Sequence, residues 1–126
     1  TKVGNTDARD GESGATGYIK YSNGPLTVAY QEFYHNAASQ AADTDGSGYA
    51  IAYSAGDMSF SYSVQTEQTN AISATAALEE EEMQAVQAAY TMGAMTVAAS
   101  LYESDNVEGV AAIKYEETEI SVSFAF

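Results

Sequence analysis

Cysteine and tryptophan are absent from this sequence, and proline and histidine occur once each. Without cysteine the chain has no disulfide framework, no thiolate metal site and no thiol nucleophile. The single histidine, His35, has no serine and aspartate at a spacing that suggests a catalytic triad. The sequence therefore contains no nucleophile–base signal, and we expect neither an enzyme nor a bound cofactor.

Basic residues are scarce: 4 Lys and Arg residues stand against 18 Asp and Glu residues, which gives a net charge of -14. This balance argues against nucleic-acid binding and against a basic patch for anionic lipid. Long apolar runs are also missing, since none approaches the roughly 20 residues that a membrane-spanning helix needs. No signal peptide is visible, and the start at Thr1 indicates an N-terminus that is processed or truncated.

The chain contains one hairpin pattern that is repeated three times, at residues 21–30, 53–62 and 90–99. Each copy has a tyrosine, a hydroxyl residue, any residue, a glycine, any residue and a large apolar residue, followed by alternating side chains. The glycine stands where a tight turn requires positive φ, and alternation with a period of two is typical of a strand with two different faces. A repeated hairpin predicts a repeated architecture.

The alternation predicts about seven strands, with a mean length near nine residues. They are Thr16–Ser22, Leu26–His35, Gly48–Ala55, Met58–Gln68, Met83–Met92, Met95–Glu103 and Thr118–Phe126. Residues 1–15, 36–47, 69–82 and 104–117 are predicted to be loops, with a helical turn possible at 74–82. Strands of this length cross a bilayer when tilted, and short turns that alternate with long acidic loops are typical of membrane barrels. The predicted fold is an all-β, antiparallel transmembrane β-barrel.

The two faces of these strands differ in kind. One face is apolar and is expected to meet lipid: Ile19, Leu26, Val28, Ile51, Met58, Phe60, Val86, Val97, Leu101, Ile120, Val122 and Phe124. The other is small and polar and is expected to line the pore: Lys20, Thr27, Gln31, Ser59, Ser61, Ser63, Gln65, Gln87, Thr96, Ser100, Glu119, Ser121 and Ser123. Tyr21, Tyr53 and Tyr90 lie beside the tight turns, as expected of an aromatic girdle at a membrane interface.

Alternation alone does not separate a barrel from a soluble sheet, whose apolar face is a core. The alternative interpretation is a secreted, acidic, β-rich structural, adhesive or filament subunit, in which the apolar faces pack against each other. The near absence of Lys and Glu from the polar faces favours the barrel, because solvated faces of soluble sheets carry more charge.

The last strand, residues 120–126, alternates apolar and small residues and ends on Phe126. It resembles the final strand of Gram-negative outer-membrane barrels, in which Ile120, Val122, Phe124 and Phe126 would form the signal read by the barrel assembly machinery. Together with the glycine-turn hairpins, residues 16–126 resemble the general diffusion porins of the alphaproteobacterial type. This resemblance implies an outer-membrane homotrimer in contact with lipid and lipopolysaccharide, which passes small hydrophilic solutes and ions.

An odd number of strands departs from a complete porin, because bacterial single-chain barrels have an even number. We therefore expect residues 1–126 to be a single domain that is the C-terminal part of a larger barrel, with the family's constriction loop upstream. Lys20 is the only cation that the pattern places on the lumen side of a strand. The excess of carboxylates then predicts a weak preference for cations.

Three acidic features remain open at this level. Asp43 and Asp45 precede Gly46 as in the front half of a calcium loop, but the distal glutamate is missing, so a plain acidic loop is the alternative. The run of acids at residues 79–82 is either a solvated loop or a site that recruits divalent cations. Glu32 is on the apolar register, so it faces lipid unless a bulge turns it inward.

Overall fold

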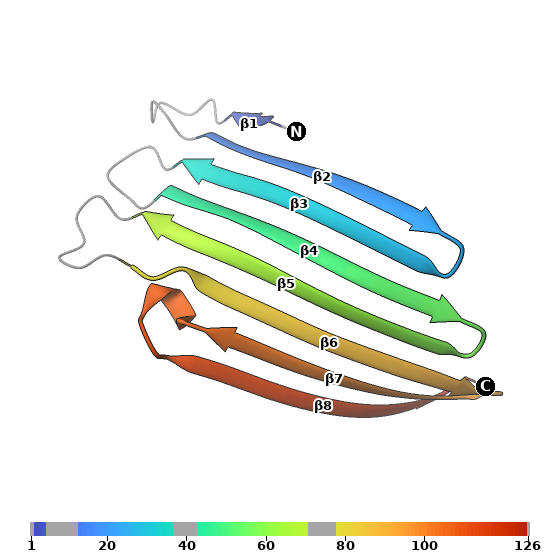
Figure 1. The fold of residues 1–126 in the computed structure, drawn as a ribbon. Coiled ribbons are helices and arrows are strands. Elements are labelled where there is room, and N and C mark those ends of the chain that lie inside the picture. The colour runs from blue at the N-terminus through green and yellow to red at the C-terminus, as the bar shows by residue number, and fades with distance from the viewer. Residues whose placement is uncertain (1, 5–12, 37–42, 71–77, 126) are drawn as a thin grey trace.

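The computed structural model describes residues 2–4, 13–36, 43–70 and 78–125. Its strands form one antiparallel sheet in sequence order, β1 to β8, as Figure 1 shows. The elements are β1 (Lys2–Gly4), β2 (Ser13–Asn23), β3 (Leu26–Asn36), β4 (Asp43–Ala55), β5 (Met58–Asn70), β6 (Glu81–Met92), β7 (Met95–Asp105), the 3-10 turn η1 (Val107–Gly109) and β8 (Lys114–Phe124). The predicted all-β antiparallel fold and its seven long strands are confirmed.

Two-residue turns join β2 to β3, β4 to β5 and β6 to β7. The first turn residues, Gly24, Gly56 and Gly93, have φ of 56, 57 and 60 degrees, whereas the second residues are not in the left-handed region. Positive φ at the first position alone is the pattern of a type II′ turn, which matches the twist of hairpin strands. The predicted role of these glycines is therefore confirmed.

The strands are longer than predicted, and the difference lies at the end opposite the tight turns. The long strands run for 11 to 13 residues. β4 begins at Asp43, β6 at Glu81 and β8 at Lys114, all within segments predicted to be loops. The stretch 1–15 also contains β1 and the start of β2, and residues 78–82 show no helical turn. Residues 74–77 of that predicted turn lie outside the described residues.

The strand ends that are joined by two-residue turns lie at one end of the sheet (the turn end), and the strand ends that are not lie at the other (the loop end), as Figure 1 shows. The long strands, with 11 to 13 residues, are long enough to cross a bilayer, since a tilted strand needs roughly 9–11 residues. The predicted alternation of short turns with long connections is therefore present in the structure.

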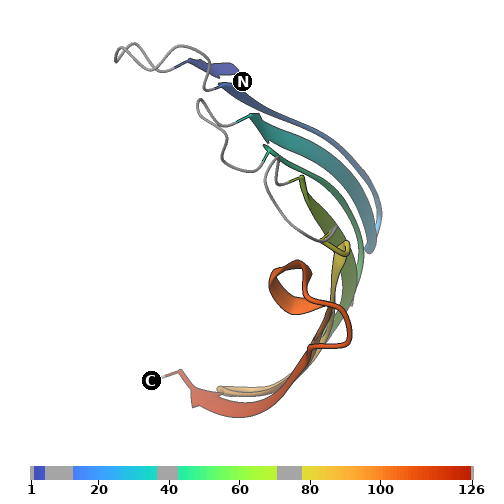
Figure 2. The same cartoon turned by 90° about the vertical axis from the view of Figure 1, so that its left-hand side faces the viewer.

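The sheet is strongly curved and open, with no pairing between β1 and β8, and Figure 2 shows its concave side. Among the described residues only one hydrophobic side chain, Val64, is buried, while large apolar side chains such as Ile120 remain 74% exposed. A sandwich would cover its apolar face with a second layer, because exposed apolar area is costly in water. No such layer is present in the described part of the chain. No helix there has the length and apolarity required to span a membrane.

Gly46 is expected to tolerate no side chain. A Cβ there would overlap the carbonyl oxygen of Thr66 on β5 and would lie 2.5 Å from Cζ of Phe33. Gly46→Ala should therefore destabilise the folded sheet by roughly 1–3 kcal/mol, the typical cost of overpacking. The temperature at which the folded, heat-modifiable band disappears on electrophoresis should fall.

Gly17→Ala is the matched control, because a Cβ at Gly17 has no neighbour within 4 Å. The same treatment should leave its transition temperature unchanged or slightly raised. Equal transition temperatures for the two variants would contradict the close packing at Gly46.

Candidate functional site

Strand pairing assigns each residue to one face, because directly paired residues point to the same side of an antiparallel sheet. One continuous row joins Thr27, Ala52, Ser61, Gln87, Ser100 and Glu119 across β3 to β8. Every residue predicted to line the pore lies on the face of this row. They are Lys20, Thr27, Gln31, Ser59, Ser61, Ser63, Gln65, Gln87, Thr96, Ser100, Glu119, Ser121 and Ser123.

This polar face is the concave one. Glu81 belongs to it, since Glu81 pairs with Glu67, two residues beyond Gln65. The Glu108 backbone N–H of the η1 segment donates to Glu81 Oε2 over 3.1 Å, and Figure 2 shows η1 on the concave side. η1 therefore lies on the same side of the sheet as the Glu81 side chain that it contacts. The face that carries Glu81 and the small polar residues is thus the inner, concave wall of the curved sheet.

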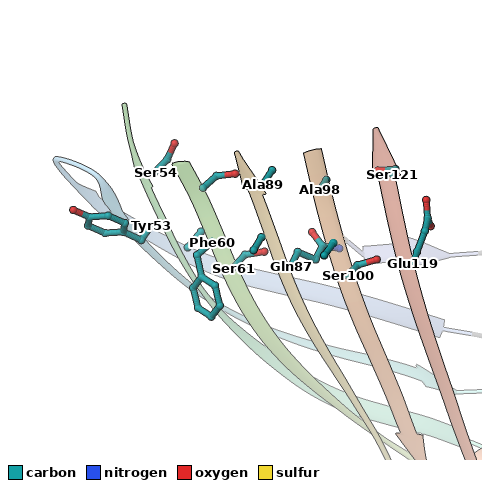
Figure 3. Close-up of a pocket in the computed structure, with 14 residues that line it drawn as sticks. Tyr53, Ser54, Phe60, Ser61, Gln87, Ala89, Ala98, Ser100, Glu119 and Ser121 are labelled. Atoms are coloured by element: carbon teal, nitrogen blue, oxygen red, sulfur yellow. The ribbon is translucent and has the colours of Figure 1, made fainter. Parts of the chain in front are cut away.

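The turn half of this wall is built from small side chains. A hollow of about 320 Å³ lies against Ser54, Ser59, Ser61, Gln87, Ser100, Glu119 and Ser121, with alanines between them. Figure 3 shows Ser61, Gln87, Ser100 and Glu119 projecting to one side of their strands, whereas Phe60 and Tyr53 project to the other. Such a surface presents hydroxyl, amide and carboxylate groups and leaves the space above it open.

The loop half of the wall carries larger side chains. A second hollow of about 330 Å³ is lined by Lys20, Gln31, Gln65 and Met83, among others. The rings of Tyr102 and Tyr115 meet edge to face with centroids 5.9 Å apart. The Tyr115 hydroxyl donates to Glu117 Oε2 over 2.7 Å. The wall is therefore bulkier toward the loop end than toward the turn end.

Sequence reasoning missed three carboxylates on this face, Glu67, Glu81 and Glu117, because two of them lay in predicted loops and one at a predicted strand end. Their register was detectable, since Glu117 stands two residues before Glu119 and Glu67 two after Gln65. Lys20 is the only cation on this face among the side chains that the structure describes. The described wall therefore carries a net negative charge, concentrated on β5 to β8.

The convex face carries the predicted apolar set. Ile19, Leu26, Val28, Ile51, Met58, Phe60, Val86, Val97, Leu101, Ile120, Val122 and Phe124 all lie on it. Tyr21, Tyr53 and Tyr90 share this face near the turn end and are 62%, 48% and 45% exposed. The predicted arrangement of an apolar band with tyrosines at its turn edge is therefore seen.

A second group of tyrosines, which the sequence analysis did not identify, lies at the loop edge of the band. Tyr30 pairs with Tyr49 on the convex face. The Tyr30 hydroxyl donates to Glu32 Oε1 over 2.6 Å, and the Tyr62 hydroxyl donates to Gln84 Oε1 over 3.1 Å. Each ring lies on the apolar band while its hydroxyl reaches a polar neighbour, which is the arrangement favoured at a membrane interface.

Beyond these tyrosines the convex face is polar and acidic. Glu32 lies there without a bulge, paired with Gly17 and Ser47 in unbroken register. Asp43 and Asp45 are in β4 and accept hydrogen bonds from Asn36 and Asn70. Because these aspartates belong to a strand paired on both sides, both interpretations, the calcium loop and the plain acidic loop, were wrong about their local structure.

No cluster of His, Asp or Glu among the described residues is arranged to hold a metal ion. For the acidic run at 79–82, Glu81 faces inward and Glu82 outward, because β6 begins at Glu81. The run is therefore divided between the two faces and does not form one solvated loop.

β8 places Ile120, Val122 and Phe124 on the convex face, where they are 74%, 54% and 59% exposed. Its pairing with β7 is continuous to Phe124, and the Ala125 N–H donates to the Ala94 carbonyl over 2.8 Å. Phe126, the remaining residue of the predicted assembly signal, lies outside the described residues.

Comparison with known proteins gave one family. The family model described as Gram-negative porin matches residues 1–126. The search of curated proteins found no significant match, and the search of solved structures found none either.

Proposed function

From the premise that the chain belongs to the Gram-negative porin family, whose members lie in the outer membrane, we propose that its concave face lines a water-filled channel. The channel passes small hydrophilic solutes and ions by passive diffusion. One observation carries this proposal: a single curved sheet leaves an apolar face exposed on its convex side and a small polar face on its concave side. In a membrane barrel, lipid would cover the apolar convex face and water would hydrate the polar concave face.

The proposed mechanism involves no covalent chemistry and no cofactor. Solutes are selected by size and by the electric field of the wall. Small side chains such as Ser61 and Ser100 keep the turn half of the lumen wide, and their hydroxyls replace part of the hydration of a passing solute. The bulkier loop half, with Tyr102 and Tyr115, narrows the path.

Cation preference is the second part of the proposal. The described wall carries Glu67, Glu81, Glu117 and Glu119 against Lys20. Rings and clusters of carboxylates attract cations in aqueous pores, and salt screens this attraction over about 8–10 Å near physiological ionic strength. We expect a weak preference that depends on ionic strength.

The partners are proposals that rest on the family. Because the described sheet is open, residues 1–126 are proposed to form a single domain that is one wall of a larger barrel. The apolar band would contact membrane lipid, and the polar, acidic part of the convex face toward the loop end would contact lipopolysaccharide. The porin would assemble as a homotrimer. Insertion would require the barrel assembly machinery, with β8 supplying the signal.

The test is reconstitution of the protein, extracted from outer membranes in detergent, into planar bilayers. We expect stepwise conductance increases and a reversal potential that indicates cation preference at low salt and a smaller preference at high salt. Absence of channels would overturn the porin proposal. Anion preference at low salt would overturn only its second part, by showing that other strands set the field.

A further inference from the structure

The connection between β7 and β8 does not extend away from the sheet. Residues 106–113, which we call the inner loop, turn over the concave side next to the start of β6 (Figure 2). Its backbone is held in an uncommon conformation: Asn106, Glu108 and Ala112 have φ of 56, 58 and 65 degrees. Non-glycine residues adopt this left-handed region at a cost, so surrounding contacts must hold them there.

Glu81 supplies the central contact. Its Oε1 accepts a hydrogen bond from Ser104 Oγ over 2.7 Å, and its Oε2 accepts one from the Glu108 backbone N–H over 3.1 Å. Ser104 is only 3% exposed and lies beneath this contact. One carboxylate on β6 thus joins the end of β7 to the inner loop, and hydrogen bonds to a charged acceptor are stronger than neutral ones.

Further contacts fix the inner loop to the residues that precede β6. Asn106 Nδ2 donates to the Glu80 carbonyl over 3.0 Å, and the Glu79 N–H donates to the Gly109 carbonyl over 2.9 Å. Gly109 approaches Leu78 so closely that a Cβ on the glycine would lie 2.9 Å from the leucine Cβ. The inner loop is therefore attached to a neighbouring strand as well as to its own two strands.

We infer that the inner loop is a constriction of the channel at the loop end, and that Glu81 is the positioning residue that holds it inside the lumen. This inference rests on the proposed function, since it requires the concave face to be the channel wall. The inner loop lies on the concave side of the sheet, and its Glu108 and Val110 side chains are exposed, Val110 by 46%. It therefore reduces the cross-section open to solutes and limits the size of those that pass.

Replacement of residues 106–113 by Asn-Gly tests the constriction. Asp105 pairs with Lys114 and the two side chains form a 2.7 Å salt bridge, so a two-residue turn closes the β7–β8 hairpin in its existing register. The measurement is sugar entry into liposomes that contain the full porin, expressed as the rate for a trisaccharide divided by the rate for a monosaccharide. This ratio is independent of the number of channels inserted.

The ratio should rise roughly twofold or more, because each narrow part of a pore slows large solutes more than small ones. Glu81→Ala should also raise the ratio, since the inner loop loses its central contact. Glu82→Ala is the matched control: it removes the same charge from the adjacent residue, but Glu82 faces outward and should leave the ratio unchanged.

The outcomes separate the two claims. No sugar entry with the unmodified protein would overturn the proposed function. Sugar entry with equal ratios for the unmodified protein, Glu81→Ala and the shortened loop would overturn the constriction while leaving the channel intact. If the shortened protein fails to fold, equal ratios for Glu81→Ala and Glu82→Ala are sufficient to overturn it.

Discussion

Phe60→Arg is expected to reduce stable insertion into the outer membrane, whereas Ser61→Arg is expected to insert normally and shift ion selectivity toward anions. The two residues are neighbours on β5, but they face opposite sides of the sheet. Phe60 pairs with Tyr53 and Ala88 on the apolar convex face, and Ser61 pairs with Ala52 and Gln87 on the concave wall. An arginine on the lipid face of a barrel costs roughly 2–4 kcal/mol at the bilayer midplane and less toward the interface, while lumen substitutions mainly tune selectivity. Phe60 lies beside Tyr53 near the turn edge of the apolar band, so we expect a cost at the lower end of this range.

The measurements are the heat-modifiable folded band in isolated membranes and the reversal potential of the inserted channels. Each variant is the other's control, because the same side chain is introduced one residue apart. A weaker folded band in Phe60→Arg alone, with a changed reversal potential in Ser61→Arg, is the expected result. Equal folded yields for the two variants would show that the assignment of the faces is wrong.

Phe126→Ala is expected to reduce assembly into the outer membrane much more than it changes the channels that do assemble. The reason lies in β8, which carries Ile120, Val122 and Phe124 on the convex face in the same alternation that Phe126 continues in the sequence. If a terminal aromatic is the signal for the assembly machinery, its removal acts before folding is complete. The folded band in membranes should decrease while single-channel conductance stays the same.

Phe60→Ala is the matched control for this effect. It removes the same side-chain atoms from the apolar convex face of β5, a strand that is paired on both sides within the sheet. If both variants lower the folded yield equally, loss of lipid contact alone explains the result and the assembly signal is not supported. An unchanged yield in Phe126→Ala would contradict the prediction directly.

The sequence by itself determined which residues of the predicted strands share a face of the sheet. Successive side chains in a strand point to opposite sides of the sheet. In residues 58–63 the large side chains of Met58, Phe60 and Tyr62 alternate with serines, so the sequence alone separates an apolar face from a polar one. It also located the tight turns, because Gly24, Gly56 and Gly93 provide positive φ at little cost.

The sequence did not predict where the strands begin and end at the loop end, and the reason is physical. Alternation is visible only while the two faces differ, and toward the loop end both faces are polar. The hydrogen-bonded ladder continues there regardless, because Asp43 still pairs with Asn70 and Asp105 with Lys114. Carboxylates such as Glu81 were consequently assigned to loops.

Only the tertiary structure decided that the inner loop turns over the concave face. That arrangement depends on Glu81 meeting Ser104 and Glu108, which are 23 and 27 positions away along the chain. Contacts of this kind leave no local periodicity, because they require β6 and β7 to be paired first and the sheet to be curved. The alternating strands therefore predicted the two faces of the sheet, and the folded sheet alone placed the inner loop over the concave one.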